Sequence, residues 1–363
     1  MKALSVYRVV AVLLLGILLV VALHYGRAFL VPLAFAVILS MLLRPVGNKL
    51  EGWGLGRIAS TLICLLLVLG LVAGFVGIIY AQVVSLSNDW PRIQPRLEAG
   101  LTTAQAWVTQ QFGMAPEQQI QALKDGASTL AQSSGGGVLA FFGGVTGFLT
   151  NLALVLLYLF FLLWQREKYR TFFLKLSSAE NRPVMGETLD KITEVSAQYL
   201  VGRLISMAVL AVMYGVGLSV VGLDDAILVS LVAVLPTLIP FVGAFIGGIF
   251  PLFMALVSGS GDLLLPTLAV LVVAQLIESN VVEPMVLSAK LHLSPIFTIV
   301  AIVAGELIWG VPGMILFEPL FAVIKIVCDH VPALHPYGFL LGEESKEPGW
   351  LKKAGSLLNR LKR

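Results

Sequence analysis

The chain has 363 residues, of which 58% are hydrophobic and 12% charged, and its mean hydropathy is +0.93. Soluble domains are about 45–50% apolar and about 25% charged, so this composition excludes a soluble globular protein and predicts an integral membrane protein. The formal net charge is only +3, and we expect no nucleic-acid partner.

A transmembrane helix needs about 20 consecutive apolar residues, and eight apolar blocks recur along the chain. We therefore predict an all-α polytopic membrane protein with about eight membrane segments. The blocks cover residues 9–23, 28–43, 58–80, 141–164, 200–221, 226–257, 263–282 and 295–327. Six of the blocks are short enough for one crossing each, whereas 226–257 and 295–327 are too long for a single straight crossing. The first block follows Lys2 and Arg8 as in a signal peptide, but no small-residue cleavage site follows, so we interpret it as a retained helix.

Positive residues near the ends of the blocks predict the orientation of the chain. Arg44, Lys49 and Arg57 lie in or beside the short loop after the second block, and residues 351–363 add five more positive charges. Cytoplasmic loops collect Lys and Arg, so both termini are expected in the cytoplasm. The segment 85–137 then lies on the far side of the membrane, where its apolar residues repeat at helical spacing.

The resulting division of the chain has six parts. Residues 1–83 form spans one to three, 84–138 extracytoplasmic amphipathic helices, 139–165 span four, 166–198 a cytoplasmic connecting helix, 199–330 a transport half with spans five to eight and broken elements, and 331–363 a basic cytoplasmic tail. Pro183 suits the start of a helix within the connecting segment.

Polar side chains inside the apolar blocks gather in the C-terminal third. An ionisable group at the bilayer centre costs at least about 2.5–3.5 kcal/mol, so it usually faces protein or water. Gln275 and Glu278 are three residues apart and share a helix face, whereas Asn280 lies off that face unless the helix unwinds before Pro284. Two interpretations remain: Glu278 lines a cavity, or it sits at the membrane edge and pairs with Lys290 or backbone.

The last block carries three further ionisable residues, Glu306, Glu318 and Lys325. Glu318 either supplies a carboxylate that binds a proton or a cation, or pairs with Lys325 two helical turns away and has no role in transport.

Two apolar blocks contain residues that interrupt helices. In block 226–257, Pro236 and Pro240 remove backbone donors, and Gly243 and Gly247 permit another backbone to approach closely. This pattern predicts a helical hairpin that turns at residues 240–243. Block 295–327 is expected to break at residues 309–314 and at Pro319. Broken elements that flank a polar helix resemble secondary transporters, although kinked helices without a solute would carry the same residues.

Five motifs give the chain a resemblance to the autoinducer-2 exporter family of bacterial inner-membrane proteins, over nearly the whole chain. They are "QYLVGRL" (198–204), "LIPFVGAFIG" (238–247), "QLIESNVVEP" (275–284), "LHLSP" (291–295) and "GELIWGVPGMILFEPL" (305–320). The resemblance implies a multi-span transporter of the inner membrane that works as a homo-oligomer, with a pentamer as one form, by an elevator-like movement of its C-terminal portion. Members are associated with export of the quorum-sensing furanone autoinducer-2, and others with exchange of sodium or lithium for protons.

The family pattern carries over to named positions of this chain. Matching positions are Pro240, Gly243, Gln275, Glu278, Asn280, Pro284, Gly305, Gly310, Gly313, Pro319 and Leu320. Two departures occur: Ala244 stands where members usually have proline, and Glu318 stands where an apolar residue is expected. The candidate pathway for a solute or ion combines six of these matching positions with Glu306 and Glu318. Its residues are Pro240, Gly243, Gln275, Glu278, Asn280, Pro284, Glu306 and Glu318.

These residues support two transport hypotheses. One is export of a small polar solute, such as autoinducer-2, whose hydroxyls would bond to Gln275, Glu278 and Asn280. The other is a sodium (lithium)/proton antiporter in which Glu278, Glu306 and Glu318 bind proton and metal alternately. The partners are accordingly a small polar solute or a monovalent cation and protons, and the lipid bilayer.

Other functions are less well supported by the sequence. Residues 223–224, 259–262 and 332–334 follow the order found in intramembrane aspartyl proteases, but Asp224 and Asp262 lie at polar ends of spans, so we expect no enzyme. A structural or permease-partner role remains open. The chain has no G-x-x-x-x-G-K-[ST] loop, and Cys64 and Cys328 stand far apart in separate blocks, so we expect no cofactor and no metal site.

Overall fold

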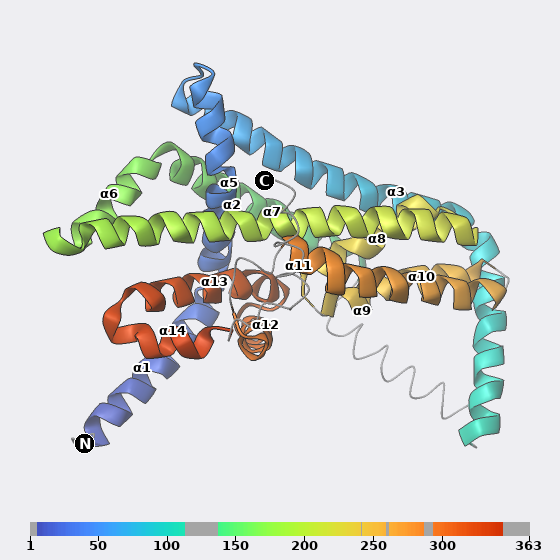
Figure 1. Ribbon diagram of the computed structural model, residues 1–363. Coiled ribbons are helices and arrows are strands. Elements are labelled where there is room, and N and C mark those ends of the chain that lie inside the picture. The colour runs from blue at the N-terminus through green and yellow to red at the C-terminus, as the bar shows by residue number, and fades with distance from the viewer. Residues whose placement is uncertain (1–5, 113–136, 241, 259–260, 287–292, 344–363) are drawn as a thin grey trace, which may run out of the picture.

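The computed structural model describes residues 6–112, 137–240, 242–258, 261–286 and 293–343, and every regular element in these ranges is a helix (Figure 1). Six helices are long and apolar enough to cross a membrane, and four shorter apolar helices of 10–17 residues accompany them. The prediction of an all-α polytopic protein with broken elements is confirmed. The two overlong blocks account for three of the four shorter helices, because each of these blocks is divided in two.

The N-terminal half packs around α2 (Arg27–Gly52), which lies beside α1 (Val6–Tyr25), α3 (Arg57–Phe112) and α5 (Gly137–Trp164). Buried side chains join α2, α3 and α5 in one core: Ala36, Leu43, Cys64, Val68, Leu159 and Leu163. The helix α3 is continuous from the third span to Phe112, whereas separate helices were expected after Ser85. It contains Pro91 and Pro95, and in Figure 1 it bends where its colour passes from blue to teal. The remainder of the expected amphipathic region, 113–136, lies outside the described residues.

The predicted connecting segment divides into two helices. The first is α6 (Arg166–Leu176), which has no buried residue; after a single turn, η1 (Ala179–Asn181), it is followed by α7 (Arg182–Val221). Pro183 stands at the start of α7, as predicted, but α7 then continues without interruption into the fifth span. It is 40 residues long and ends at Gly222, whose φ of 84° suits a glycine cap. Connecting helix and span are therefore one rigid element.

The block 226–257 forms a broken hairpin. Its first arm is α8 (Ala226–Val234) with η2 (Leu235–Leu238), and its second arm is α9 (Val242–Val257). A Cβ atom at Gly243 would overlap the carbonyl of Pro236, and one at Gly247 would overlap the carbonyl of Ala233. The glycines thus permit the close approach of the two arms that their spacing predicts.

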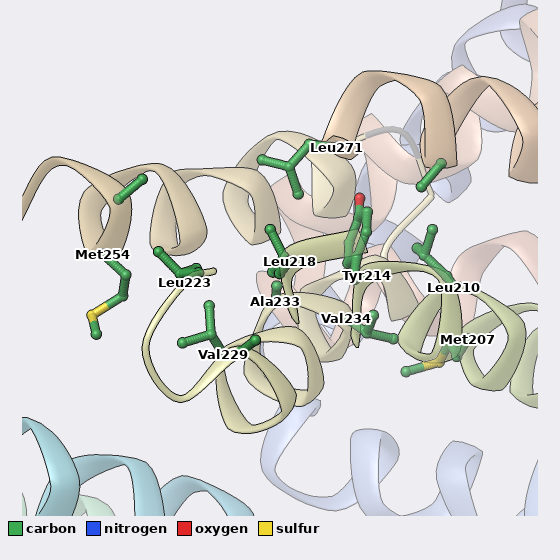
Figure 2. Close-up of a cluster of buried hydrophobic side chains, with 13 residues drawn as sticks. Met207, Leu210, Tyr214, Leu218, Leu223, Val229, Ala233, Val234, Met254 and Leu271 are labelled. Atoms are coloured by element: carbon green, nitrogen blue, oxygen red, sulfur yellow. The ribbon is translucent and has the colours of Figure 1, made fainter. Parts of the chain in front are cut away.

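The hairpin packs against α7 and α10 (Leu264–Ile277), which follows the short turn η3 (Gly261–Leu263). Figure 2 shows the core between them, in which α7 contributes four of the labelled side chains. The labelled members are Met207, Leu210, Tyr214, Leu218, Leu223, Val229, Ala233, Val234, Met254 and Leu271. Beyond α10 the chain continues as a π-helical turn, η4 (Glu278–Val282), and α11 (Glu283–Val286).

The last block is divided into α12 (Pro295–Trp309) and α13 (Val311–His330), followed by η5 (Pro332–Leu334) and α14 (His335–Leu341). Gly310 separates α12 from α13 with φ 68° and ψ −146°, a conformation that only glycine adopts readily. The break at 309–314 is thus confirmed. The predicted interruption at Pro319 is wrong, because α13 passes through Pro319 and ends at His330.

Candidate functional site

One face of α7 carries a row of polar side chains that point into the protein. Tyr199, Arg203, Ser206 and Tyr214 follow one another at intervals of three, four or eight residues, which places them on the same side of the helix. All four are buried between α7 and the C-terminal elements. We call them, together with the side chains they contact, the α7 polar cluster.

Each member of the row contacts a different element. Tyr199 Oη donates a hydrogen bond of 2.9 Å to Glu318 Oε2 on α13. Arg203 Nη2 donates to the carbonyl of Thr237 in η2, and Ser206 Oγ donates to Glu278 Oε1 in η4. Farther along, Tyr214 Oη lies 3.5 Å from Gln275 Oε1 on α10. The α7 polar cluster therefore joins both broken elements and the polar helix between them.

Glu278 lies at the centre of these contacts. Only 5% of its surface is exposed, and its two carboxylate oxygens accept hydrogen bonds from Ser206 Oγ and from Gln275 Nε2, the latter at 3.0 Å. The contact with Gln275 is the one that their three-residue spacing predicts. Glu278 begins the π-helical turn η4, and such turns inside α-helices occur frequently at functional sites. The side chain points into the protein, and Lys290, its alternative partner, lies outside the described residues.

The break before α9 is connected to the same cluster. Pro240 has no backbone N–H, so it cannot continue the helical hydrogen-bond pattern of η2. Thr237, three residues before Pro240, presents its carbonyl to Arg203 instead. Pro240 and Gly243 are both buried, and the Gly243 amide bonds to the Ile239 carbonyl at 3.0 Å. The described backbone groups named here thus have partners within the protein, as hydrocarbon surroundings would require.

Asn280 and Glu306 lie outside the contacts of the α7 polar cluster named above. Asn280 is exposed, and its side-chain amide bonds to the Leu276 carbonyl of its own helix at 2.9 Å. Glu306 is exposed on α12. Pro284 is half-buried beyond η4. The structure therefore brings together Gln275, Glu278 and Glu318, and places Asn280 and Glu306 apart from them.

The alternative pairing of Glu318 with Lys325 is wrong. Glu318 is 8% exposed and accepts the hydrogen bond of Tyr199, whereas Lys325 Nζ lies 2.6 Å from Asp329 Oδ2, one turn farther along α13. A lysine four residues before an aspartate on the same helix has its partner at close range. Glu318 thus belongs to the interior, and Lys325 to the end of the helix.

The α7 polar cluster contains more potential negative charge than positive charge. Glu278 and Glu318 are buried, Glu283 is half-buried, and Arg203 is the cation that acts electrostatically on Glu283 and Glu318. Among the described residues, no ion pair within 4.0 Å joins Arg203 to these carboxylates, and its Nε atom has no hydrogen-bond partner. The described part of the chain contains no group of three acidic, His or Cys side chains placed to hold a metal ion.

An apolar groove leads toward this cluster from the outside. It has a volume of about 420 Å³, lies between α9 and α10, and reaches Tyr214 and Gln275 at its inner end. Phe245, Ile249 and Leu268 line it farther out. The groove thus connects the lipid-facing side of the C-terminal half with hydrogen-bonding groups.

Sequence reasoning missed the contribution of α7. Arg203 is the sole charged residue between positions 200 and 221, and "QYLVGRL" contains both Tyr199 and Arg203. This isolated arginine in an apolar block could therefore have indicated the site, because an ionisable residue inside a membrane segment marks a functional site by default. Ser206 and Tyr214 gave no comparable signal, since single hydroxyl groups are common in membrane helices.

A helical, multi-pass membrane protein with a polar cluster buried between its own broken helices has the construction of a membrane transporter. The family model described as AI-2E family transporter matches residues 9–333, and the chain belongs to this family.

Named relatives cover most of the chain. YueF of Bacillus subtilis, a candidate transport protein by name, is 27% identical over 303 residues, which are 81% of this chain and 82% of YueF. YrrI of the same organism, also a candidate transport protein, is 24% identical over 84% of this chain and 87% of its own. PerM of Escherichia coli, a candidate permease by name, is 25% identical over 88% of this chain and 93% of its own. These names agree with a general role in transport and with the expectation that the chain is not an enzyme.

Proposed function

We propose that this chain is a secondary transporter of the bacterial inner membrane that exports a small polar solute, with autoinducer-2 as the leading candidate. The observation that carries the proposal is Glu278, which is buried at membrane depth and held by the neutral donors Ser206 and Gln275. A buried acceptor among neutral hydroxyl and amide groups suits a hydroxyl-bearing solute, because such a solute can replace each of these hydrogen bonds.

The proposed movement is elevator-like and involves the C-terminal half. Two close backbone contacts make rigid pairs there: α8 with α9 at Gly247, and α12 with α13 at Gly305 and Gly313. Tightly packed pairs move as units, because packed interiors resist continuous deformation. In this proposal both termini lie in the cytoplasm, the solute enters between the broken elements, and a homo-oligomer supports the moving parts.

A specific observation favours a second candidate, a sodium (lithium)/proton antiporter. Glu278 and Glu318 belong to the α7 polar cluster, and Glu283 lies near enough for the one guanidinium of the cluster, that of Arg203, to act on its charge. A cluster with surplus carboxylates can take up a proton or a monovalent cation to balance its charge. The same groups would serve a solute exporter that is driven by protons.

The test uses the full chain in proteoliposomes with a pH-sensitive dye inside. A furanone solute and sodium or lithium salts are added separately, with and without a proton gradient. Glu278→Gln keeps the size of the side chain and removes its charge, and we expect it to lower solute flux at least about tenfold, the equivalent of one lost hydrogen bond to a charged group. The matched control is Glu187→Gln on an exposed turn of α7, which should transport normally.

The outcomes separate the two candidates. Solute flux that depends on Glu278 and does not change when sodium or lithium is added supports the exporter. Dissipation of the proton gradient by sodium or lithium supports the antiporter. Asn280→Ala should retain transport, since its amide bonds only its own helix and a neighbouring serine. If Glu278→Gln transports as well as Glu187→Gln, the α7 polar cluster is not the binding site.

A further inference from the structure

A second cavity lies at the end of the bundle where positive residues gather, and none of its lining side chains belongs to the α7 polar cluster. It is a crevice of about 920 Å³ between α2, α6, the first turns of α7 and the end of α13. In Figure 1, α6 and the start of α7, which border it, lie on the left. Its volume is near the upper end of the range of about 300–1,000 Å³ that small-molecule pockets occupy. None of the transport residues discussed above lines it.

The mouth of this crevice carries one uncompensated positive charge. Arg170 forms a two-pronged ion pair with Asp190, with both nitrogen–oxygen distances at 2.8 Å. Arg44 lies 3.8 Å from the same carboxylate and makes no hydrogen bond among the described residues. Two guanidinium groups thus share one carboxylate. Since a guanidinium has five N–H donors, Arg44 retains donors for a further anionic group.

Two other arginines at this end are already paired. Arg166 Nη2 lies 2.5 Å from Glu51 Oε2, and Arg57 lies within 4.0 Å of both Glu51 and Glu167. These four groups balance one another in charge. Among the charged side chains that line the crevice, the surplus positive charge is therefore at Arg44 and Arg170.

The interior of the crevice is apolar. Its walls include Val37, Met41, Leu163, Val184, Val323 and Val327, which come from four different helices. Helix α6 borders the mouth with exposed aromatic side chains, among them Tyr169 and Phe173. A short helix with no buried residue, aromatic side chains and basic residues is typical of the interface between lipid and water.

We propose that this crevice binds an anionic phospholipid, with its headgroup phosphate at Arg44 and Arg170 and its acyl chains along the apolar walls of α2, α7 and α13. The combination of a cationic mouth and an apolar interior matches such a lipid at both ends. Basic pockets between membrane helices on the cytoplasmic side bind anionic headgroups in this way. A free phosphate would leave the apolar walls uncovered, and a second copy of the chain would have to supply an acidic group on an apolar surface.

Native mass spectrometry of the full chain tests the proposal. The purified protein is mixed with equal amounts of phosphatidylglycerol and phosphatidylcholine that carry the same acyl chains. We expect the protein to retain phosphatidylglycerol preferentially, and Arg44→Gln to lower this preference about fivefold, the effect of one basic residue near an anionic lipid. The matched control is Lys49→Gln, which removes one charge from the exposed end of the same helix and lies outside the crevice.

A second variant protects the test against a change in folding. Asp190→Asn removes the carboxylate that competes with the phosphate, so it should raise the preference for phosphatidylglycerol while Arg44→Gln lowers it. A general loss of folding would move both variants in the same direction.

Three results would overturn the proposal. Equal losses in Arg44→Gln and Lys49→Gln would show an effect of surface charge alone. Displacement of the lipid by an equal concentration of water-soluble glycerol phosphate would show a site for free phosphate esters. If the intact oligomer retains no phosphatidylglycerol and Arg44→Gln dissociates that oligomer, the crevice is a contact between subunits.

Discussion

Replacement of Arg203 by methionine is the most direct perturbation of the α7 polar cluster. The side chain is 8% exposed and donates to the carbonyl of Thr237 at the break before α9. It is also the cation that faces Glu283 and Glu318. Methionine fills a similar volume but offers no donor and no charge. The substitution thus removes one hydrogen bond and leaves the buried carboxylates without their counter-charge.

The expected loss of stability follows from these two roles. A hydrogen bond to a charged group contributes about 1.5–3 kcal/mol. Removal of one member of a buried ion pair costs about 3–5 kcal/mol, which is an upper bound here because no carboxylate of the described residues lies within 4.0 Å of Arg203 and a buried carboxylate can take up a proton. We expect about 3 kcal/mol, which corresponds to a fall of about 4 °C in the unfolding midpoint of a protein of this size.

Unfolding in detergent can be followed with a thiol-reactive dye. Cys64 and Cys328 are free and buried, the first in the core of α2, α3 and α5 and the second on α13. They become reactive when these helices separate. Arg203→Lys is the matched control, since it retains the charge and loses the planar guanidinium, and it should unfold between the wild type and Arg203→Met.

A double variant shows whether the charge is the cause. Glu318→Gln removes one of the carboxylates that Arg203 faces, so in the Arg203→Met background it should restore part of the lost stability. The reasoning is refuted if Arg203→Met unfolds within about 1 kcal/mol of the wild type, or if Glu318→Gln destabilises both backgrounds equally.

Two further predictions concern packing and charge in the C-terminal half. Gly305→Val should prevent accumulation of folded protein, as measured by size-exclusion chromatography. The valine side chain would overlap the backbone of Gly313, and overpacking costs about 1–3 kcal/mol even where side chains can yield. The control Gly74→Val, at a position with open space around it, should elute normally. Lys325→Gln should change stability by about 1 kcal/mol or less and leave transport unchanged, because its partner Asp329 lies one turn away on the same helix and is 37% exposed. A loss of transport in Lys325→Gln would contradict the assignment of Glu318 to the interior.

The interruptions of the helices could be predicted from sequence because their causes are local. Pro240 lacks a donor, and Gly310 adopts a conformation that other residues avoid, so each marks its break without reference to the rest of the chain. The contact between Gln275 and Glu278 follows from helical spacing in the same way. The local rule failed at Pro319, where the chain remains helical because proline can bend a helix without ending it, as it also does at Pro91 and Pro95.

The partners of the buried carboxylates could not be predicted, because they come from a helix more than 70 residues away in sequence. Tyr199 meets Glu318, and Ser206 meets Glu278, only after α7 has packed against α13 and α10. Acidic residues draw attention in an apolar sequence, whereas a tyrosine and a serine do not. The sequence therefore indicated the acceptors of the site and the donor Gln275, and left out the donors on α7.

The extent of the α7 polar cluster along the membrane bears on what it does. Tyr199 and Tyr214 are 15 positions apart on one helix, so at 1.5 Å per residue the row extends over about 22 Å along α7. Each buried polar group adds a desolvation cost that its hydrogen bonds must offset. If the C-terminal half moves as proposed, contacts repeated along α7, each to a different broken or polar element, would let a solute or ion exchange one set of hydrogen bonds for the next.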